Sequence, residues 1–431
     1  MSIQMLERHE SQVRVYSRQF PVMFDKAEGP FVYDAAGTRY TDFLAGAGSL
    51  NYGHNNPAIR DAVIAYLQGG GIVQSLDLFT AAKATFVEDF VSHILAPRGL
   101  GEYKLQFVGP TGTNSVEAAL KLARKITGRT EVVAFTDGFH GVSLGALAAS
   151  GEMGKRKAAG QPLPNITRAP FDGYHGNIDT MALMERMFSD PNSGWEPPAA
   201  FIVEVVQGEG GLNVASTEWL RSLETLARRL GSMLIIDEVQ TGCGRTGDFF
   251  AFEASGITPD LICLSKSLGG IGLPMALVLV RPEHDCWKPG EHNGTFRGMC
   301  LSFVAASAAI RTYWADAGFM TDVRKKAVLI RARLNEIAGR HRGVSVVGRG
   351  MMIGLRFADA SAADAVSRMC FEANLIVETC GPNSNTLKLL APLTIPNDVL
   401  LNGLEQIATC VSRTLDTEDA PVSGPSLALT P

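Results

Sequence analysis

MLIIDEVQTGCGRTGDFFAFEASGITPDLICLSKSLGGIGLP, residues 233–274, contains two short apolar runs that are separated by a glycine-rich segment. The runs, 233–239 and 260–265, are nearly continuous in apolar residues, which is typical of parallel strands covered on both faces. Polar residues close both runs, Asp237-Glu238 the first and Ser265-Lys266-Ser267 the second. Because ligands of such sheets bind at the carboxyl ends of the strands, these residues are candidates for chemistry.

Further runs of the same kind extend the predicted sheet. They are KLQFVG (104–109), EVVAFT (131–136) and AAFIVEVVQ (199–207). Between them, apolar residues recur at helical spacing over 116–123 and over 219–230, and Gly231 is placed to end the second helix. The alternation of strands and helices predicts an α/β fold with a mostly parallel sheet in a large domain.

The pattern changes after residue 300. Two helical stretches (303–316 and 321–340) lead to the alternating segment GVSVVGRGMMIGLRF, and then come a helix, a strand near 375–378, LKLLAPL and a final helix. These elements predict a smaller α+β domain, which a hairpin in FVYDAAGTRYTDF (31–43) is expected to join. We therefore expect four parts: an N-terminal segment joining the small domain (1–50), a large domain (51–300), the small domain (301–415) and a disordered tail (416–431).

Composition and charge narrow the class of protein. The chain has 431 residues, is 46% hydrophobic and has a net charge of −5, with no basic run that would bind nucleic acid. No apolar run reaches the ~18 residues that a membrane span needs, and the polar N-terminus lacks an apolar signal core. The seven cysteines show neither a disulfide framework nor zinc spacing. The sequence predicts a cytoplasmic protein with small-molecule partners and no resident metal.

One predicted strand end suits an anion. The run 104–109 continues into GPTGTNSVE, which opens a helix at about Gly112 and Thr113. Small residues let backbone N–H groups approach an anion, and the helix N-terminus adds positive potential. The alternative is an ordinary strand–helix turn, because a glycine motif by itself is a weak signal. A P-loop is excluded, since the GK[ST] ending is missing.

Three more strand ends carry unusual residues. Asp237 closes a buried strand and needs a partner there, which could be an arginine or the protonated ring nitrogen of a ligand. Lys266 ends another buried strand, where desolvation would lower its pKa and make the amine nucleophilic. The pair Phe139-His140 lies between glycines after 131–136, and Phe139 could stack on a planar ring. Each residue alone could instead be structural.

Together the four strand ends match one cofactor. They supply an anion cup, a carboxylate for a ring nitrogen, a lysine for an aldehyde and an aromatic ring for stacking. Pyridoxal 5′-phosphate (PLP) has these four features, and a lysine Schiff base with an acidic pyridinium partner is its recurring binding pattern. The sequence therefore predicts a PLP enzyme in which Lys266 carries the cofactor.

The sequence also resembles a family, the class III (ω-amino acid) aminotransferases of fold type I. TGTNSVEAALKLAR, GFHG, IIDEVQTGCGRTG, LSKSLGGIGLP and NGTFRG occur in the order and spacing of that family. The resemblance implies catalytic roles for Lys266 and Asp237, and a homodimer or dimer of dimers in which Thr295 reaches the phosphate of the neighbouring subunit. It implies further cofactor contacts from Gly112, Thr113, Phe139, His140, Val239 and Gln240.

The resemblance also implies a substrate. GAGSLNYGHNNP, PFDGYHG, EVVQGEGGLNVAS and KPGEHNGTFRG are similar to the subgroup of the ectoine pathway, which exchanges an amino group between L-2,4-diaminobutyrate and 2-oxoglutarate. Aspartate 4-semialdehyde and glutamate are the products. VQSLDLFTAAK (73–83) departs from that subgroup, which has a histidine and a methionine there. In relatives that use ω-amines, a glutamate–arginine pair opens and closes for the two substrates. Glu204 and Lys388 are expected to serve here, and the alternative is that they form an ordinary ion pair.

Two alternatives remain at this point. The first is another PLP enzyme of the same fold, namely an aminomutase, an amino-acid racemase or a transaminase of a different ω-amine. All of these would need the same lysine and aspartate, and a requirement for a keto-acid co-substrate separates a transaminase from the other two. A phosphate- or nucleotide-binding protein without catalysis is the second alternative. It would have no need of Lys266 at a strand end.

Overall fold

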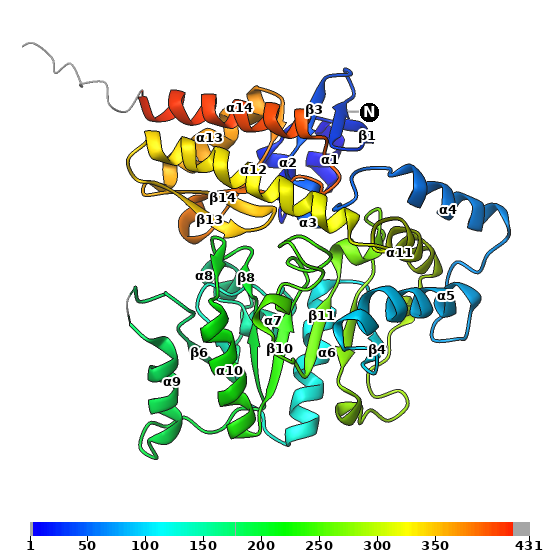
Figure 1. The fold of residues 1–431 in the computed structure, drawn as a ribbon, viewed down its shortest axis with the longest axis vertical. Helices are drawn as coiled ribbons and strands as arrows, with labels where there is room; N and C mark the ends of the chain where they lie inside the picture. Colours follow the sequence, from blue (N-terminus) through cyan, green and yellow to red (C-terminus); the bar gives the residue numbers. More distant parts are fainter. Residues whose placement is uncertain (1–2, 177, 417–431) are drawn as a thin grey trace, which may run out of the picture.

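A computed structural model of the chain describes residues 3–176 and 178–416 (Figure 1). Its large unit contains a seven-stranded sheet in the order β4-β12-β11-β10-β7-β5-β6. The strands are β4 (Lys104–Phe107), β5 (Val132–Phe135), β6 (Ile166–Ala169), β7 (Ala200–Val203), β10 (Met233–Asp237), β11 (Leu261–Leu264) and β12 (Leu277–Val280). All five predicted apolar runs enter this sheet.

The sheet differs from the prediction in two respects. β12 lies between β11 and β4 and is antiparallel to both, whereas the pairs from β11 to β6 are parallel. The predicted strand 199–207 is two strands, because β7 ends at Val203 and the chain turns into β8 (Val206–Gln207), which pairs with β9 (Asn213–Val214). Glu204 therefore lies in a turn between two sheets.

Helices cover both faces of the large sheet. The helices of the chain are α1 (Ile3–His9), α2 (Tyr16–Gln19), α3 (Ala45–Gly48), α4 (Pro57–Gln68), α5 (Ala81–Asp89), α6 (Gly112–Thr127), α7 (Leu144–Ala149), α8 (Met153–Lys157), α9 (Thr180–Ser189), α10 (Thr217–Leu230), α11 (Cys300–Tyr313), α12 (Gly318–Arg340), α13 (Ala360–Glu372) and α14 (Asn397–Asp416). Leu234 and Ile236 of β10 pack in the core that contains α10, while Ile235 packs in the core that contains α6. Gly231 ends α10 in the left-handed conformation (φ 61°), as its position in the sequence predicts.

The small unit lies over one end of the large sheet (Figure 1). It contains the antiparallel sheet β13-β14-β17-β16 and the helices α12 to α14. The strands are β13 (Val344–Arg349), β14 (Met352–Phe357), β16 (Glu378–Cys380) and β17 (Thr386–Leu389). A second sheet, β1-β2-β3-β15, joins the N-terminal hairpin to β15 (Leu375–Ile376). Its other strands are β1 (Phe24–Glu28), β2 (Phe31–Asp34) and β3 (Arg39–Asp42).

The boundary expected at residue 300 does not match the packing. α11 packs against α4 and α5 of the large unit, so residues 301–313 belong with that unit in space. At the other end, Asp416 is the last residue of α14, and the expected tail beyond it lies outside the described residues.

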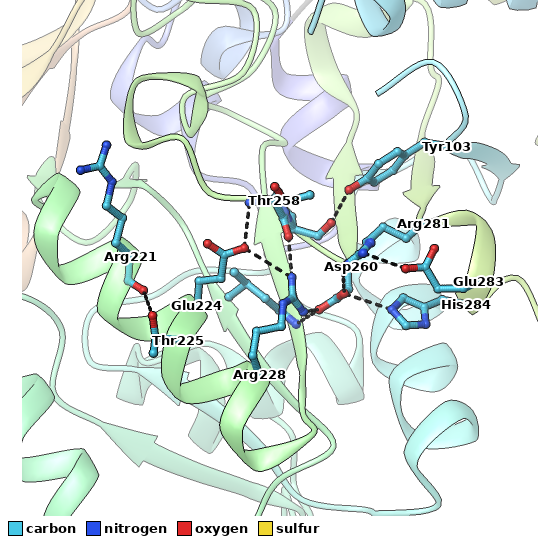
Figure 2. A network of polar contacts seen from close by, with 12 residues as sticks. Tyr103, Arg221, Glu224, Thr225, Arg228, Thr258, Asp260, Arg281, Glu283 and His284 are labelled. Atoms are coloured by element: carbon cyan, nitrogen blue, oxygen red, sulfur yellow. Dashed lines mark hydrogen bonds and ion pairs between the residues drawn. The ribbon is translucent and has the colours of Figure 1, made fainter. Parts of the chain in front are cut away.

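A buried carboxylate organises the opposite end of the large sheet (Figure 2). Asp260 precedes β11 and is 1% exposed. Its carboxylate contacts Arg228, Arg281 and His284, and it accepts a hydrogen bond of 2.8 Å from the backbone N–H of Leu234. Because two arginines and a histidine surround this one carboxylate, the cluster has the features of a structural ion network.

Candidate active site

Most of the predicted site residues meet around one cavity. The cavity has a volume of about 170 Å³ and is lined by Gly112, Thr113, Phe139, His140, Gly141, Glu204, Glu209, Asp237, Val239, Gln240 and Lys266. These residues come from the carboxyl ends of β4, β5, β7, β10 and β11 and from the loops that follow them. Among the predicted residues, Thr295 and Lys388 are outside this lining, although both are in the described part of the chain.

Lys266 follows the buried strand β11 directly and opens a short 3-10 turn, Lys266–Gly269. Its φ of 50° is in the left-handed region, which costs a non-glycine residue on the order of 1–3 kcal/mol. Burial lowers the pKa of the Lys266 amine, while the carboxylate of Glu209 opposes that shift. A strained, desolvated amine that faces a cavity is the arrangement expected of a nucleophile.

Asp237 is held in a fixed orientation at the end of β10. Its Oδ2 lies 2.8 Å from Nδ1 of His140, and its Oδ1 accepts a hydrogen bond of 3.0 Å from the backbone N–H of Val239. His140 is fixed in turn, because its backbone N–H donates to Ser150 Oγ at 2.9 Å. Both carboxylate oxygens are thus held in place, and no lysine or arginine contacts the carboxylate in the described structure. A cationic ring nitrogen would complete its surroundings.

The predicted anion cup contains more polar groups than the sequence suggested. α6 begins at Gly112, and Thr113 Oγ1 lies 2.5 Å from Ser143 Oγ, which donates to Glu117 Oε1 at 2.7 Å. Gly141 has a φ of 128°, and a Cβ there would lie 2.3 Å from Thr113 Oγ1. The loop therefore needs glycine to approach the helix N-terminus. Ser143 and Glu117 were not predicted, because nothing in their spacing distinguishes them from surface residues.

Two walls of the cavity come from Phe139 and Val239. A Cβ on Gly112 would lie 2.7 Å from Val239 Cγ1, so the close approach of α6 to this wall requires glycine. The backbone N–H of Phe139 donates to Glu204 Oε2 at 2.8 Å, and that of Gly208 donates to Glu204 Oε1 at 3.1 Å. Burial raises the pKa of Glu204 to about 7. Glu204 therefore supports the loop that carries Phe139.

The predicted pair of Glu204 and Lys388 is wrong. Lys388 Nζ lies 2.8 Å from Glu209 Oε1 and 3.0 Å from Glu378 Oε1. The reason is the turn after β7, which directs Glu204 towards Phe139, whereas Glu209 follows β8 and reaches β17. Glu209 and Glu378 were both missed. A carboxylate between glycines in QGEGG was the available signal for Glu209, since it follows a predicted strand end.

The residues around the cavity fit PLP. Gln240 donates from Nε2 to Ala47 O at 3.2 Å and to Glu209 Oε1 at 3.3 Å, while its buried Oε1 has no hydrogen-bond partner among the described residues. A hydroxyl of a bound molecule would satisfy that oxygen. The glycine-lined cup, Asp237 and the desolvated Lys266 would supply the phosphate, pyridinium and aldehyde contacts. No group of three metal-ligating side chains occurs in the described ranges, and no helix there is long and apolar enough to span a bilayer.

Known proteins are similar to this chain in sequence and in fold. The family described as Aminotransferase class-III matches residues 13–411. Diaminobutyrate--2-oxoglutarate transaminase from Bordetella parapertussis is 50% identical over 422 residues, 97% of this chain and 97% of its own length. The protein of the same name from Halomonas elongata is also 50% identical, over 96% of this chain and 99% of its own length.

A solved structure of a PLP-containing aminotransferase has a similar fold. Ornithine aminotransferase from Toxoplasma gondii, with partial occupancy of PLP at its active site, aligns with a TM-score of 0.83 and 25% identity, and the alignment covers 96% of this chain and 94% of that chain. The predicted fold class and the predicted cofactor are confirmed. The chain therefore belongs to the class-III aminotransferases, and it is a PLP-dependent transaminase.

Proposed function

We propose that this transaminase exchanges the terminal amino group of L-2,4-diaminobutyrate with 2-oxoglutarate, with L-aspartate 4-semialdehyde and glutamate as the other pair. The observation that carries the proposal is the 50% identity, over nearly the whole chain, to relatives named for this reaction. In the biosynthetic direction the enzyme would supply diaminobutyrate, the use expected in the ectoine pathway. All seven cysteines are free, which favours a reducing compartment such as the cytoplasm.

Each cavity residue has a task in this reaction. When bound, PLP supplies an aldehyde that condenses with amines and a pyridinium ring that accepts the electrons of a deprotonated carbon. Lys266 Nζ would bind the aldehyde until the donor amine displaces it. The freed amine would then take the proton from the donor carbon and deliver it to the aldehyde carbon of the cofactor, and its lowered pKa favours the free-amine form. Asp237 would hold a negative charge at the ring nitrogen. Because His140 and Val239 fix both carboxylate oxygens, that charge needs no reorganisation during the reaction.

The two substrates place their charged groups differently around the reacting carbon. 2-Oxoglutarate brings a carboxylate beside the reacting carbon, whereas diaminobutyrate brings its carboxylate and second amine at the far end. The pair that would be broken and remade for them is Glu209–Lys388, which replaces the pair predicted from sequence. Glu209 lines the cavity and Lys388 is fully buried behind it, so movement of Glu209 would expose a cation to the keto acid.

We also propose a homodimer with a shared active site. Thr295 lies in a short 3-10 turn, Thr295–Gly298, whose carbonyl at Thr295 accepts a hydrogen bond from Gln74. Around this turn large apolar side chains are exposed, including Leu78 (63%), Phe79 (100%) and Phe296 (58%). A patch of this kind is typical of a surface that another subunit covers.

A donor panel tests the reaction. The purified holoenzyme is given 2-oxoglutarate and, one at a time, diaminobutyrate, ornithine, 4-aminobutyrate and β-alanine, and glutamate is measured. We expect diaminobutyrate to give the highest kcat/KM. Good turnover of another ω-amine without turnover of diaminobutyrate would disprove the substrate. Turnover of a single amino acid without any keto acid would instead indicate an aminomutase or racemase.

A further inference from the structure

Lys388 is a buried cation that faces two carboxylates. It is 0% exposed on β17, and its Nζ contacts Glu209 Oε1 at 2.8 Å and Glu378 Oε1 at 3.0 Å. Lys266 also acts on both carboxylates, but burial lowers the pKa of its amine and favours the neutral form, so two carboxylates face one permanent ammonium and one negative charge is left uncompensated. Because uncompensated buried charge is costly, one more cation beside these carboxylates would stabilise the cluster.

The two carboxylates are held differently. Glu378 of β16 is directly opposite Lys388 in the antiparallel register of β16 and β17, so the sheet fixes this cross-strand pair. Glu209, in contrast, follows β8 in a loop and lies between Gly208 and Gly210. Glu209 also lines the cavity next to Lys266, which Glu378 does not. Glu378 is therefore the fixed partner of Lys388, and Glu209 is the partner that faces the substrate.

The surroundings of Glu378 indicate that its charge is only partly compensated. Its Oε2 accepts a hydrogen bond of 3.2 Å from the Tyr16 hydroxyl, but its buried Oε1 has no hydrogen-bond partner among the described residues. The 3.0 Å contact with Lys388 is thus an ion pair without hydrogen-bond alignment. Burial raises the pKa of Glu378 in spite of Lys388, whereas Lys388 lowers the pKa of Glu209 to about 2 against the effect of burial.

We propose that Glu378 determines the class of amino donor: by neutralising Lys388 from behind, it leaves Glu209 free to bind a second ammonium group of the donor. With one carboxylate per cation, a donor's ammonium would have to compete with Lys388 for Glu209. With two carboxylates, Glu209 can direct its charge into the cavity while Glu378 still compensates Lys388. The preferred donors then carry a second amino group, and ω-amino acids with a carboxylate alone at the far end are disfavoured. This inference rests on the proposed function and extends it.

The test compares two donors that differ in a single group. 4-Aminobutyrate is L-2,4-diaminobutyrate without the α-amino group, and both present a terminal amine. Stopped-flow measurement of the half-reaction of the holoenzyme gives the rate constant and the apparent KM for each. In Glu378→Gln we expect kcat/KM for diaminobutyrate to fall about 10-fold or more, mostly through KM, with that for 4-aminobutyrate unchanged or higher.

Three controls separate specificity from stability. Glu372→Gln removes an exposed carboxylate at the end of α13 and should change the kinetics of neither donor. Tyr16→Phe removes the hydrogen bond but leaves the charge of Glu378, so the donor preference should shift less than about 3-fold. The double variant Glu378→Gln/Lys388→Met removes the cation as well, so Glu209 is free again and the preference for diaminobutyrate should return. This rescue keeps the test decisive if Glu378→Gln is poorly folded.

Failure of the role of Glu378 and failure of the proposed substrate give different results in this test. Equal losses for both donors in Glu378→Gln, or no rescue in the double variant, would overturn the inference and leave Glu378 a structural role. If the wild-type enzyme uses ornithine but not diaminobutyrate, the proposed substrate fails, and ornithine against 5-aminopentanoate then decides the role of Glu378. A wild-type preference for 4-aminobutyrate over every diamine would overturn both proposals.

Discussion

His140 Nδ1 lies 2.8 Å from Asp237 Oδ2, and both residues are buried, each with 4% exposure. The two residues belong to the ends of different strands, β5 and β10, so the large sheet sets their separation. With Oδ1 held by the backbone N–H of Val239, the carboxylate has one orientation towards the cavity. We therefore expect the charge of Asp237, and not its shape, to be what the ring nitrogen of PLP requires.

Asp237→Asn should therefore bind PLP but transfer protons slowly. Asparagine keeps the size of the side chain and an oxygen for the N–H of Val239, but it has no charge to hold the ring nitrogen protonated. We expect the half-reaction to slow by about 100-fold or more, the loss usual when a preorganised charge is removed. Absorbance of the bound cofactor and stopped-flow kinetics measure the two effects. Asp61→Asn, at an exposed aspartate of α4, is the control, and near-normal turnover in Asp237→Asn would remove Asp237 from this role.

Lys266→Ala should abolish transamination while the fold survives. The side chain lies at the cavity, and alanine at the same φ of 50° carries similar backbone strain, so circular dichroism and the melting temperature should stay near those of the wild type. Reduction with borohydride should attach the cofactor to the peptide that contains Lys266 in the wild type and to no peptide in the variant. Lys104→Ala, at an exposed lysine of β4, should label and turn over normally. More than trace turnover in Lys266→Ala would exclude Lys266 as the residue that carries PLP.

The strand ends were predictable because local sequence determines them. Lys266 and Asp237 each follow an apolar run that is too short and too continuous for a surface helix, and parallel strands bring such ends together. Gly112 is also informative about the site from local sequence, because glycine is required where α6 approaches Val239.

The charged cluster behind the cavity was not predictable in the same way. Which carboxylate meets Lys388 depends on the turn that splits 199–207 into β7 and β8, and on the register that places Glu378 opposite Lys388. Both are long-range features, and a shift of one residue in register would direct either side chain to the other face. The run 199–207 has no glycine or proline to mark its break, so the sequence alone points to Glu204 in place of Glu209.

Hybrid dimers should show whether Thr295 acts on the neighbouring subunit. Thr295→Asp adds a negative charge that would repel phosphate, and Lys266→Ala removes the catalytic amine, so each parent should be inactive. If Thr295 acts in trans, a hybrid dimer has one intact site, and random mixing should restore about a quarter of the wild-type activity. Native mass spectrometry of differently tagged subunits verifies the exchange. Complete exchange without recovered activity would count against a shared site.

The last prediction concerns Glu238, which is 1% exposed beside Asp237. Its carboxylate accepts hydrogen bonds from Thr241 Oγ1 and from the backbone N–H of Phe252, and no lysine or arginine pairs with it in the described structure. Burial raises the pKa of Glu238 from 4.5 to about 7, although both hydrogen bonds oppose the shift. The folded protein therefore holds this proton at a pH at which the unfolded chain has released it.

The raised pKa of Glu238 makes the stability of the folded protein depend on pH. Since the folded pKa is the higher one, the stabilisation is fully present below about pH 4.5 and is lost as the pH rises through about 7. A shift of that size corresponds to on the order of 3 kcal/mol. Glu238→Gln cannot titrate, so its free energy of unfolding relative to wild type should rise by that order between pH 5 and 8.5, as measured by urea unfolding of the holoenzyme. Glu196→Gln, at an exposed glutamate, should give a curve parallel to wild type. A parallel curve for Glu238→Gln would mean that Glu238 is ionised in the folded protein throughout this range.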